Sequence, residues 1–191
     1  MAPKIKTTKE DLIEAAIRLV RKGGAAAIGA RSLAAEAGCS TQPIFSNFSS
    51  MEELLDRVLA AAYDLYLGFI RAEVESGKYP KYKAFGMAYI RFAKEESELF
   101  KLLFMRDRGG NESTASPDFD ASVNMIMESG SISKEDATTM HLELWAFVHG
   151  IATMLATSFF TPSTELISKM TSDVYGGLRA KYIKEENNER N

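Results

Sequence analysis

The sequence is poor in the residues that form covalent cross-links and metal sites. Its one cysteine, Cys39, has no internal disulfide partner, and its two histidines, His141 and His149, are eight positions apart. Eight residues of helix span about 12 Å, which is too far for both rings to bind one ion. We therefore expect no disulfide and no metal site. We expect Cys39 to be a small buried residue that packs at a turn rather than a redox sensor.

Long apolar runs are absent as well. Charged residues interrupt every apolar stretch before the roughly 20 residues that span a bilayer, and residues 1–9 are polar and lysine-bearing with no apolar block behind them. We therefore expect no membrane span, no secretory signal and a cytoplasmic location. An apolar content of 46% beside 26% charged residues matches a folded globular protein rather than a disordered chain.

Catalytic groupings are also missing from the sequence. No nucleophile–base pair, carboxylate pair or phosphate-binding loop stands out, and Cys39 has no identifiable base. An enzyme is therefore the remotest interpretation, and we expect no cofactor.

The chain as a whole has no net positive charge, since its net charge is −3. An excess of basic residues is nevertheless found at one end. Residues 1–50 carry seven lysines and arginines against four acidic residues, whereas the remainder carries 16 against 22. A basic end on an acidic body is the distribution expected when only one end meets nucleic-acid phosphates. The excess is modest, so it supports nucleic-acid binding without establishing it.

Residues 30–48 predict two short helices joined by a tight turn. The first helix carries an apolar stripe, and Gly38 then supplies a left-handed backbone where that helix must stop and reverse. Ser40 or Thr41 offers an oxygen to cap the second helix, whose apolar positions recur every four residues. Helix, glycine turn and short capped helix is the pattern of a helix-turn-helix, whose second helix enters the DNA major groove.

Helical periodicity continues along the rest of the chain, with no strand pattern and no internal repeat. The predicted fold class is all-α. About nine helices are expected, over residues 8–22, 30–37, 41–48, 51–77, 81–94, 99–105, 118–129, 133–159 and 162–183. Four of them begin with a capping sequence: Thr7 with Glu10, Ser50 with Glu53, Ser133 with Asp136, and Thr161 followed by Pro162. Polar residues 106–117 and 184–191 are expected to be mobile.

The N-terminal pattern resembles the TetR/AcrR family of transcriptional regulators. The residues that carry the resemblance are Ala15, Ala16, Leu19, Leu33, Ala34, Ala37, Gly38, Ser40, Ile44, Phe45, Phe48, Ser50, Glu52 and Leu54. A second resemblance lies in Leu144–Gly150, LWAFVHG, which together with Glu98–Phe104 is similar to the Trp/His-Gly C-terminal domain of some members.

The resemblance implies a ligand-responsive repressor that binds palindromic DNA as a homodimer. Residues 1–50 would form the helix-turn-helix DNA-binding domain, and residues 51–191 a ligand-binding and dimerisation domain whose last two helices pair with a second copy. A ligand in the larger domain would displace the fourth helix, change the spacing of the two recognition helices and release the operator.

Side chains of the recognition helix and its approach are the expected DNA contacts. The resemblance places Thr41, Gln42 and Pro43 against the bases. Gln42 can pair with adenine, and the Pro43 ring suits a thymine methyl. Arg31 and either Lys6 or Lys9 would meet phosphates or the minor groove. The predicted DNA-binding residues are Arg31, Ser40, Thr41, Gln42, Pro43, Phe45 and Asn47. The competing interpretation is a solvated face on a structural corner.

Two positions depart from the family pattern. Phe45 stands where the family usually has a tyrosine, and Met51 where it usually has a lysine, and both family residues reach phosphates. Their absence removes sequence-independent affinity, although amides at the start of the fourth helix can still accept a phosphate. The alternative function is therefore a dimeric small-molecule-binding protein with weakened or lost DNA binding.

Aromatic and thioether side chains mark the helices that enclose the ligand in the resembled family. The candidates are Tyr66, Phe69, Tyr89, Phe92, Phe104, Met127, Trp145 and His149. Such a mixture suits a small hydrophobic ligand of unknown identity, whereas the competing interpretation is simple core packing. For His141 alone we expect a core histidine with a satisfied hydrogen bond.

Overall fold

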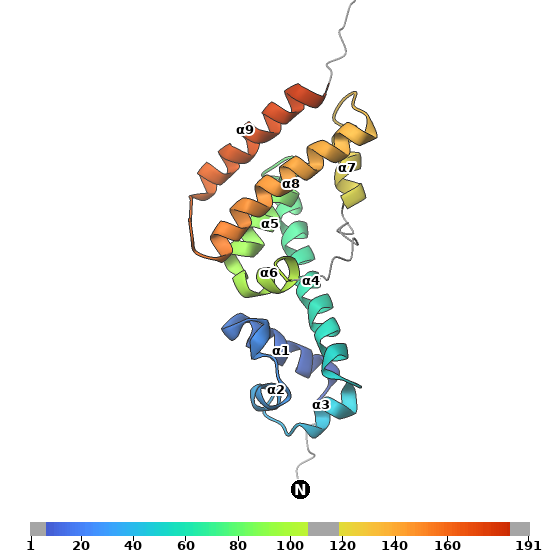
Figure 1. Cartoon of the computed structure of the whole chain (residues 1–191), viewed down its shortest axis with the longest axis vertical. Coiled ribbons are helices and arrows are strands. Elements are labelled where there is room, and N and C mark those ends of the chain that lie inside the picture. The colour runs from blue at the N-terminus through green and yellow to red at the C-terminus, as the bar shows by residue number, and fades with distance from the viewer. Residues whose placement is uncertain (1–6, 107–118, 184–191) are drawn as a thin grey trace, which may run out of the picture. The chain divides into compact units, whose positions relative to one another are not determined.

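The computed structural model describes residues 7–106 and 119–183. These residues form nine α-helices and one short 3-10 helix (Figure 1), which confirms the all-α prediction. The helices are α1 (Lys9–Gly23), α2 (Ala30–Glu36), α3 (Gln42–Asn47), α4 (Met51–Glu75), α5 (Lys81–Glu95), α6 (Ser97–Phe104), α7 (Phe119–Met127), α8 (Lys134–Ala156) and α9 (Thr164–Tyr182), with the 3-10 helix at Ala25–Ala27. The expected mobile segments, apart from Arg106, lie outside the described residues.

The first capping box lies one residue later than predicted. Thr8, not Thr7, caps α1: its hydroxyl accepts a hydrogen bond from the Asp11 amide at 3.1 Å, and the Asp11 carboxylate accepts one from the Thr8 amide at 2.9 Å. Two adjacent threonines followed by two adjacent acids make the sequence pattern ambiguous by one position. The shorter carboxylate of Asp11 closes the box here, in place of Glu10.

The start of α9 is also later than predicted. Ser163 is the cap, since its hydroxyl accepts from the Leu166 amide at 3.2 Å, so the expectation that Thr161 and Pro162 open the helix was wrong. A serine with extended backbone directly before the helix supplies the capping oxygen in place of Thr161. The caps at Ser50 and Ser133 are confirmed by hydrogen bonds from the Glu53 and Asp136 amides at 3.1 and 3.0 Å.

Packing divides the chain into two compact units, each described by itself. The first unit comprises residues 1–69 and 92–106, so it holds α1–α3, most of α4, the end of α5, and α6. Leu12, Leu33, Ile44, Phe48 and Leu54 are almost completely buried in it. The predicted functional division at residue 50 concerns activity, and it stays a prediction.

The second unit comprises residues 70–91 and 107–191. Its core is formed where α7 and α9 pack on α8, with Val123, Ile126, Met140, Leu144 and Ile183 buried together. Ile183, directly after α9, lies so close to Gly130 that a Cβ at Gly130 would meet its side chain. No described helix combines the length and apolarity needed to cross a bilayer.

Candidate functional site

The corner between α2 and α3 forms as the sequence indicates. Gly38 has a φ of +65°, in the left-handed region that favours glycine. The Cys39 amide then donates to the Ala34 carbonyl at 2.9 Å, which closes the end of α2. Cys39 is half-buried rather than fully buried. The turn therefore reverses the chain between two short helices.

One face of α3 is anchored and the other is open. Ile44 is 1% exposed and Phe48, directly after the helix, is 2% exposed, whereas Phe45 is 57% exposed. Gln42 and Ser46 are exposed on the same helix. The buried pair fixes the orientation of α3, so it presents Gln42 and Phe45 outward from a rigid support.

The cap of α3 differs from the sequence expectation. Thr41 occupies the capping position, but neither its side chain nor that of Ser40 makes a described capping hydrogen bond. Instead, side chains at the other end bind the backbone of the helix: the Asn47 amide group donates to the Pro43 carbonyl at 2.8 Å, and the Ser46 hydroxyl donates to the Gln42 carbonyl at 2.9 Å. The hydroxyl groups of Ser40 and Thr41 are thus available for an external partner.

The predicted DNA-binding residues differ in accessibility. Arg31, Ser40, Gln42 and Phe45 are exposed, whereas Thr41, Pro43 and Asn47 are half-buried. That they contact DNA remains a prediction.

Four of the five lysines and arginines in residues 7–50 are paired with carboxylates. Arg18 and Lys22 both bind Glu36, with N–O distances of 3.0 and 2.7 Å, and Arg21 binds Glu96. Hydrogen bonds from Lys22, and to a smaller extent from Arg18, hold the pKa of Glu36 below its usual range. Lys9 pairs with Glu53 at 3.5 Å. Within residues 7–50, Arg31 alone among lysines and arginines forms no ion pair, so these other cations chiefly hold helices together.

Four of the predicted ligand-binding side chains form one aromatic cluster in the first unit. The ring of Tyr66 lies 5.5 Å from that of Phe92 and 5.3 Å from that of Phe104, and Phe69 meets Phe92 at 5.3 Å between centroids. Phe92 is completely buried. This tilted and edge-to-face arrangement is that of a packed aromatic core.

Three more of these side chains meet in the second unit. The Tyr89 hydroxyl lies 2.8 Å from His149 Nδ1, and the Trp145 ring stacks on His149 with centroids 5.2 Å apart. Burial lowers the pKa of His149, so the ring is neutral near pH 7. One turn further along α8, the hydroxyl oxygen of Thr153 is buried without a hydrogen bond to any described group. The eighth candidate, Met127, packs elsewhere, beside the core around α7.

A second tyrosine–histidine pair repeats this arrangement. The Tyr82 hydroxyl lies 2.9 Å from His141 Nδ1, which confirms the expectation that the hydrogen bonding of His141 is satisfied; the residue is half-buried. Sequence reasoning missed Tyr82. The signal was present, because tyrosines seven apart on α5 match histidines eight apart on α8.

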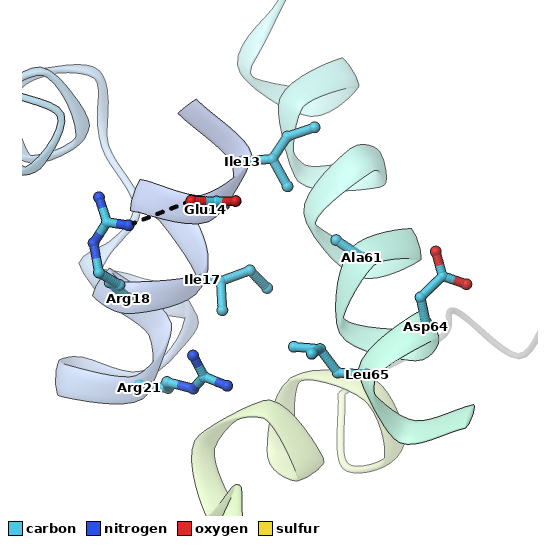
Figure 2. A pocket seen from close by; sticks show the side chains of 8 residues that line it. All are labelled: Ile13, Glu14, Ile17, Arg18, Arg21, Ala61, Asp64 and Leu65. Carbon is cyan, nitrogen blue, oxygen red and sulfur yellow. Dashed lines mark ion pairs between the residues drawn. The ribbon is translucent and has the colours of Figure 1, made fainter. Parts of the chain in front are cut away.

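The first unit also contains a groove that the sequence did not predict. Ile17 of α1 and Leu65 of α4 point toward each other, Ile13 lies between the same two helices, and four charged side chains also line the groove: Glu14, Arg18, Arg21 and Asp64 (Figure 2). Its volume is about 490 Å³. None of the eight predicted ligand-binding residues lines this groove.

The fold and the exposed face of α3 place the protein in the class of all-α helix-turn-helix proteins. Two family models match the chain: "Bacterial regulatory proteins, tetR family" over residues 12–58, and "Tetracyclin repressor-like, C-terminal domain" over residues 82–173. The chain therefore belongs to the TetR family of transcriptional regulators, with a helix-turn-helix DNA-binding domain. The finer resemblance to Trp/His-Gly domains stays a prediction.

Solved structures agree with this assignment at the level of fold. A TetR-family protein from Vibrio parahaemolyticus has a TM-score of 0.63 at 18% identity, covering 93% of this chain and 99% of that one. A transcriptional regulator from Rhodococcus sp. RHA1 has a TM-score of 0.66 at 20% identity, covering 94% and 100%. A ketosteroid transcriptional regulator of Mycobacterium tuberculosis has a TM-score of 0.51 at 17% identity, covering 96% and 99%. No curated protein matches the sequence significantly.

Proposed function

We propose that this protein is a ligand-responsive repressor that binds palindromic operator DNA as a homodimer. The observation that carries the proposal is the geometry of α3, in which buried Ile44 and Phe48 fix the helix while Gln42 and Phe45 remain exposed. A helix held in this way on a rigid corner can present base-reading side chains to a major groove. Its place of action is then the cytoplasm, with the chromosome.

The expected contacts follow from the chemistry of the exposed and half-buried side chains of the corner. Gln42 can pair with an adenine, Pro43 can contact a thymine methyl, and Arg31 provides an unpaired cation for a phosphate. The hydroxyls of Ser40 and Thr41 are uncommitted donors. The side-chain amide of Asn47 donates a hydrogen bond to the backbone of α3, so we assign it the role of stabilising that helix.

Exposed apolar side chains support the homodimer. Six apolar side chains on α8, on α9 and between the two helices are each at least 39% exposed: Leu142, Trp145, Met154, Phe159, Phe160 and Leu166. Exposed apolar surface of this kind is typical of an interaction site. A two-fold pair would place two recognition helices in successive major grooves, roughly 34–36 Å apart.

The side chains around His149 support a hydrophobic ligand with a polar group. Tyr89, His149 and Trp145 offer flat ring faces, and the buried Thr153 hydroxyl lacks a hydrogen bond to the described part of the chain. A buried polar atom in apolar surroundings favours a ligand that supplies the missing partner. If the ligand binds more tightly to the conformation in which α4 is displaced than to the DNA-bound conformation, it would release the operator.

Fluorescence anisotropy with labelled DNA from the region flanking the gene tests DNA binding. We expect a palindromic fragment to bind in a salt-sensitive way, and a shuffled fragment of equal length to bind far more weakly. Equal binding to both fragments, or no binding at low salt, would contradict the proposal.

Phe45 and Met51 favour one alternative, a dimeric ligand-binding protein that has lost DNA binding. The variant Met51→Lys separates the two functions. On a true operator binder it should tighten binding to all sequences about equally and steepen the salt dependence by roughly one counterion per site. If only non-specific binding appears, the alternative function is correct.

A further inference from the structure

Two lysines of the second unit share one aromatic ring. The ammonium groups of Lys78 and Lys83 lie 5.1 and 4.8 Å from the centroid of the Tyr79 ring, so they are within about 10 Å of each other. The Tyr79 side chain raises the pKa of Lys78, which keeps this exposed group charged. An anion placed near both ammonium groups would be attracted by each of them.

Lys83 is bound entirely by neutral groups. Its ammonium donates to the Ser168 carbonyl at 3.0 Å, to the Ser168 hydroxyl at 2.8 Å and to the Ser172 hydroxyl at 2.8 Å. These bonds use all three of its protons. No described carboxylate pairs with Lys83, so its charge remains uncompensated by an ion pair.

The two serines have unused donors as a result. Each hydroxyl accepts a hydrogen bond from Lys83, yet neither donates to a described acceptor. By contrast, Thr171 on the same helix donates to the Ile167 carbonyl at 2.8 Å, which is the usual partner of a helical hydroxyl. The protons of Ser168 and Ser172 are therefore available, and the adjacent ammonium strengthens them as donors.

These groups surround a groove of about 450 Å³. It is lined by Lys78, Tyr79, Thr164, Glu165, Ser168, Lys169 and Ser172. Its lining contains one carboxylate, Glu165, which opposes Lys78, and Asp173 outside the lining pairs with Lys169. The charge of Lys83, which is bonded to the lining serines, is left in excess. The groove thus combines a net positive charge with two uncommitted hydroxyl donors.

We propose that this groove binds a phosphate group. Ser168 and Ser172 would donate hydrogen bonds to its oxygens, and the excess of Lys78, Lys83 and Lys169 over Glu165 and Asp173 would attract its negative charge. Lys83 is a positioning residue: all three of its protons are hydrogen-bonded to Ser168 and Ser172, so it orients these two serines. The Tyr79 ring provides a flat wall for the rest of a phosphorylated small molecule.

The groove lies on a different face of α9 from the exposed apolar residues. At about 100° per residue, Ser168 and Ser172 are at least about 120° around the helix from Leu166. A second copy covering the Leu166 face would leave the groove open. The site is therefore independent of the proposed dimer interface and of DNA binding.

Titration of the full-length protein with inorganic phosphate, followed by amide NMR shifts, tests the proposal. We expect saturable shifts at Tyr79, Ser168 and Ser172. Lys78→Gln should weaken binding about three- to fivefold, and Ser172→Ala about two- to tenfold. Lys134→Gln removes the same charge from an exposed position at the start of α8, and should leave binding unchanged.

Several results would overturn the proposal. These are the absence of saturable shifts at the groove, equal weakening by Lys78→Gln and Lys134→Gln, or equal binding of acetate at matched ionic strength. Because the readout is residue-resolved, phosphate that binds only at α3 gives shifts there and also counts against the groove. Retained chemical shifts elsewhere in each variant show that it is folded.

Discussion

At the scale of single residues, the exposed ring of Phe45 is the most informative departure from the family pattern. It is 57% exposed on α3, so its ring contributes little to the core. We predict that Phe45→Tyr leaves the free energy of unfolding unchanged and tightens DNA binding about two- to tenfold, because the added hydroxyl can reach a phosphate. Anisotropy titration measures the affinity, and urea unfolding measures the stability. Phe45→Leu, which adds no donor, is the control and should not tighten binding.

Two glycines should respond in opposite directions to the same substitution. A Cβ at Gly38 would meet no atom within 4 Å, so only its φ of +65° opposes a side chain. We predict that Gly38→Ala lowers the free energy of unfolding by about 1 kcal/mol. Gly176 lies inside α9 with equally open space, so Gly176→Ala should raise it by about 0.5–1 kcal/mol. Urea unfolding at one protein concentration compares them. Equal effects would show that backbone strain at Gly38 is unimportant.

The ion-pair partner of each lysine and arginine was the part of the site that could not be predicted from the sequence. Counting predicted a basic end, but a count does not show which carboxylate each cation meets. Glu36 is close in sequence to neither Arg18 nor Lys22, yet it binds both, and Glu96 lies 75 positions from Arg21. These partners are known only once the helices are packed.

At the scale of helices, we expect the paired tyrosine–histidine contacts between α5 and α8 to make stability depend on pH. Burial lowers the pKa of both His141 and His149, so the folded state binds fewer protons than the unfolded state near and below pH 6.5. We predict that the free energy of unfolding falls as pH drops below about 6.5. Urea unfolding from pH 8 to pH 5 measures this trend.

The matched variants are His141→Gln and His149→Gln together. A glutamine can accept a hydrogen bond from tyrosine but does not titrate. The double variant should therefore flatten the pH dependence between pH 8 and pH 5. An unchanged slope in the double variant would show that carboxylates, not these histidines, control it.

Helices were predicted well from periodicity, whereas their ends were not. The nine helices were all expected, but the caps of α1 and α9 lie one and two residues later than predicted. Adjacent capping residues, such as Thr7 with Thr8, give the same local signal at two positions. Which of them caps the helix depends on how the following turn packs, and that information is not local.

At the scale of the whole molecule, the only tryptophan reports on assembly. Trp145 is 48% exposed on α8, among the apolar residues proposed to form the dimer interface. We predict that Trp145→Asp yields a monomer and weakens operator binding by more than tenfold, because one half-site alone then contributes. Analytical ultracentrifugation measures the oligomeric state. Lys134→Gln is a suitable exposed control on the same helix, and a dimer that persists in Trp145→Asp would place the interface elsewhere.

The ion-paired cations of α1 have a consequence for how the regulator searches the genome. A protein that slides along DNA needs many loose positive charges that exchange phosphates without regard to sequence. Here Lys9, Arg18, Arg21 and Lys22 are tied to carboxylates of the same unit. Residence on random DNA would be brief, and the operator would be reached mainly by repeated encounters through solution. Occupancy would then follow the cellular concentration of the protein closely.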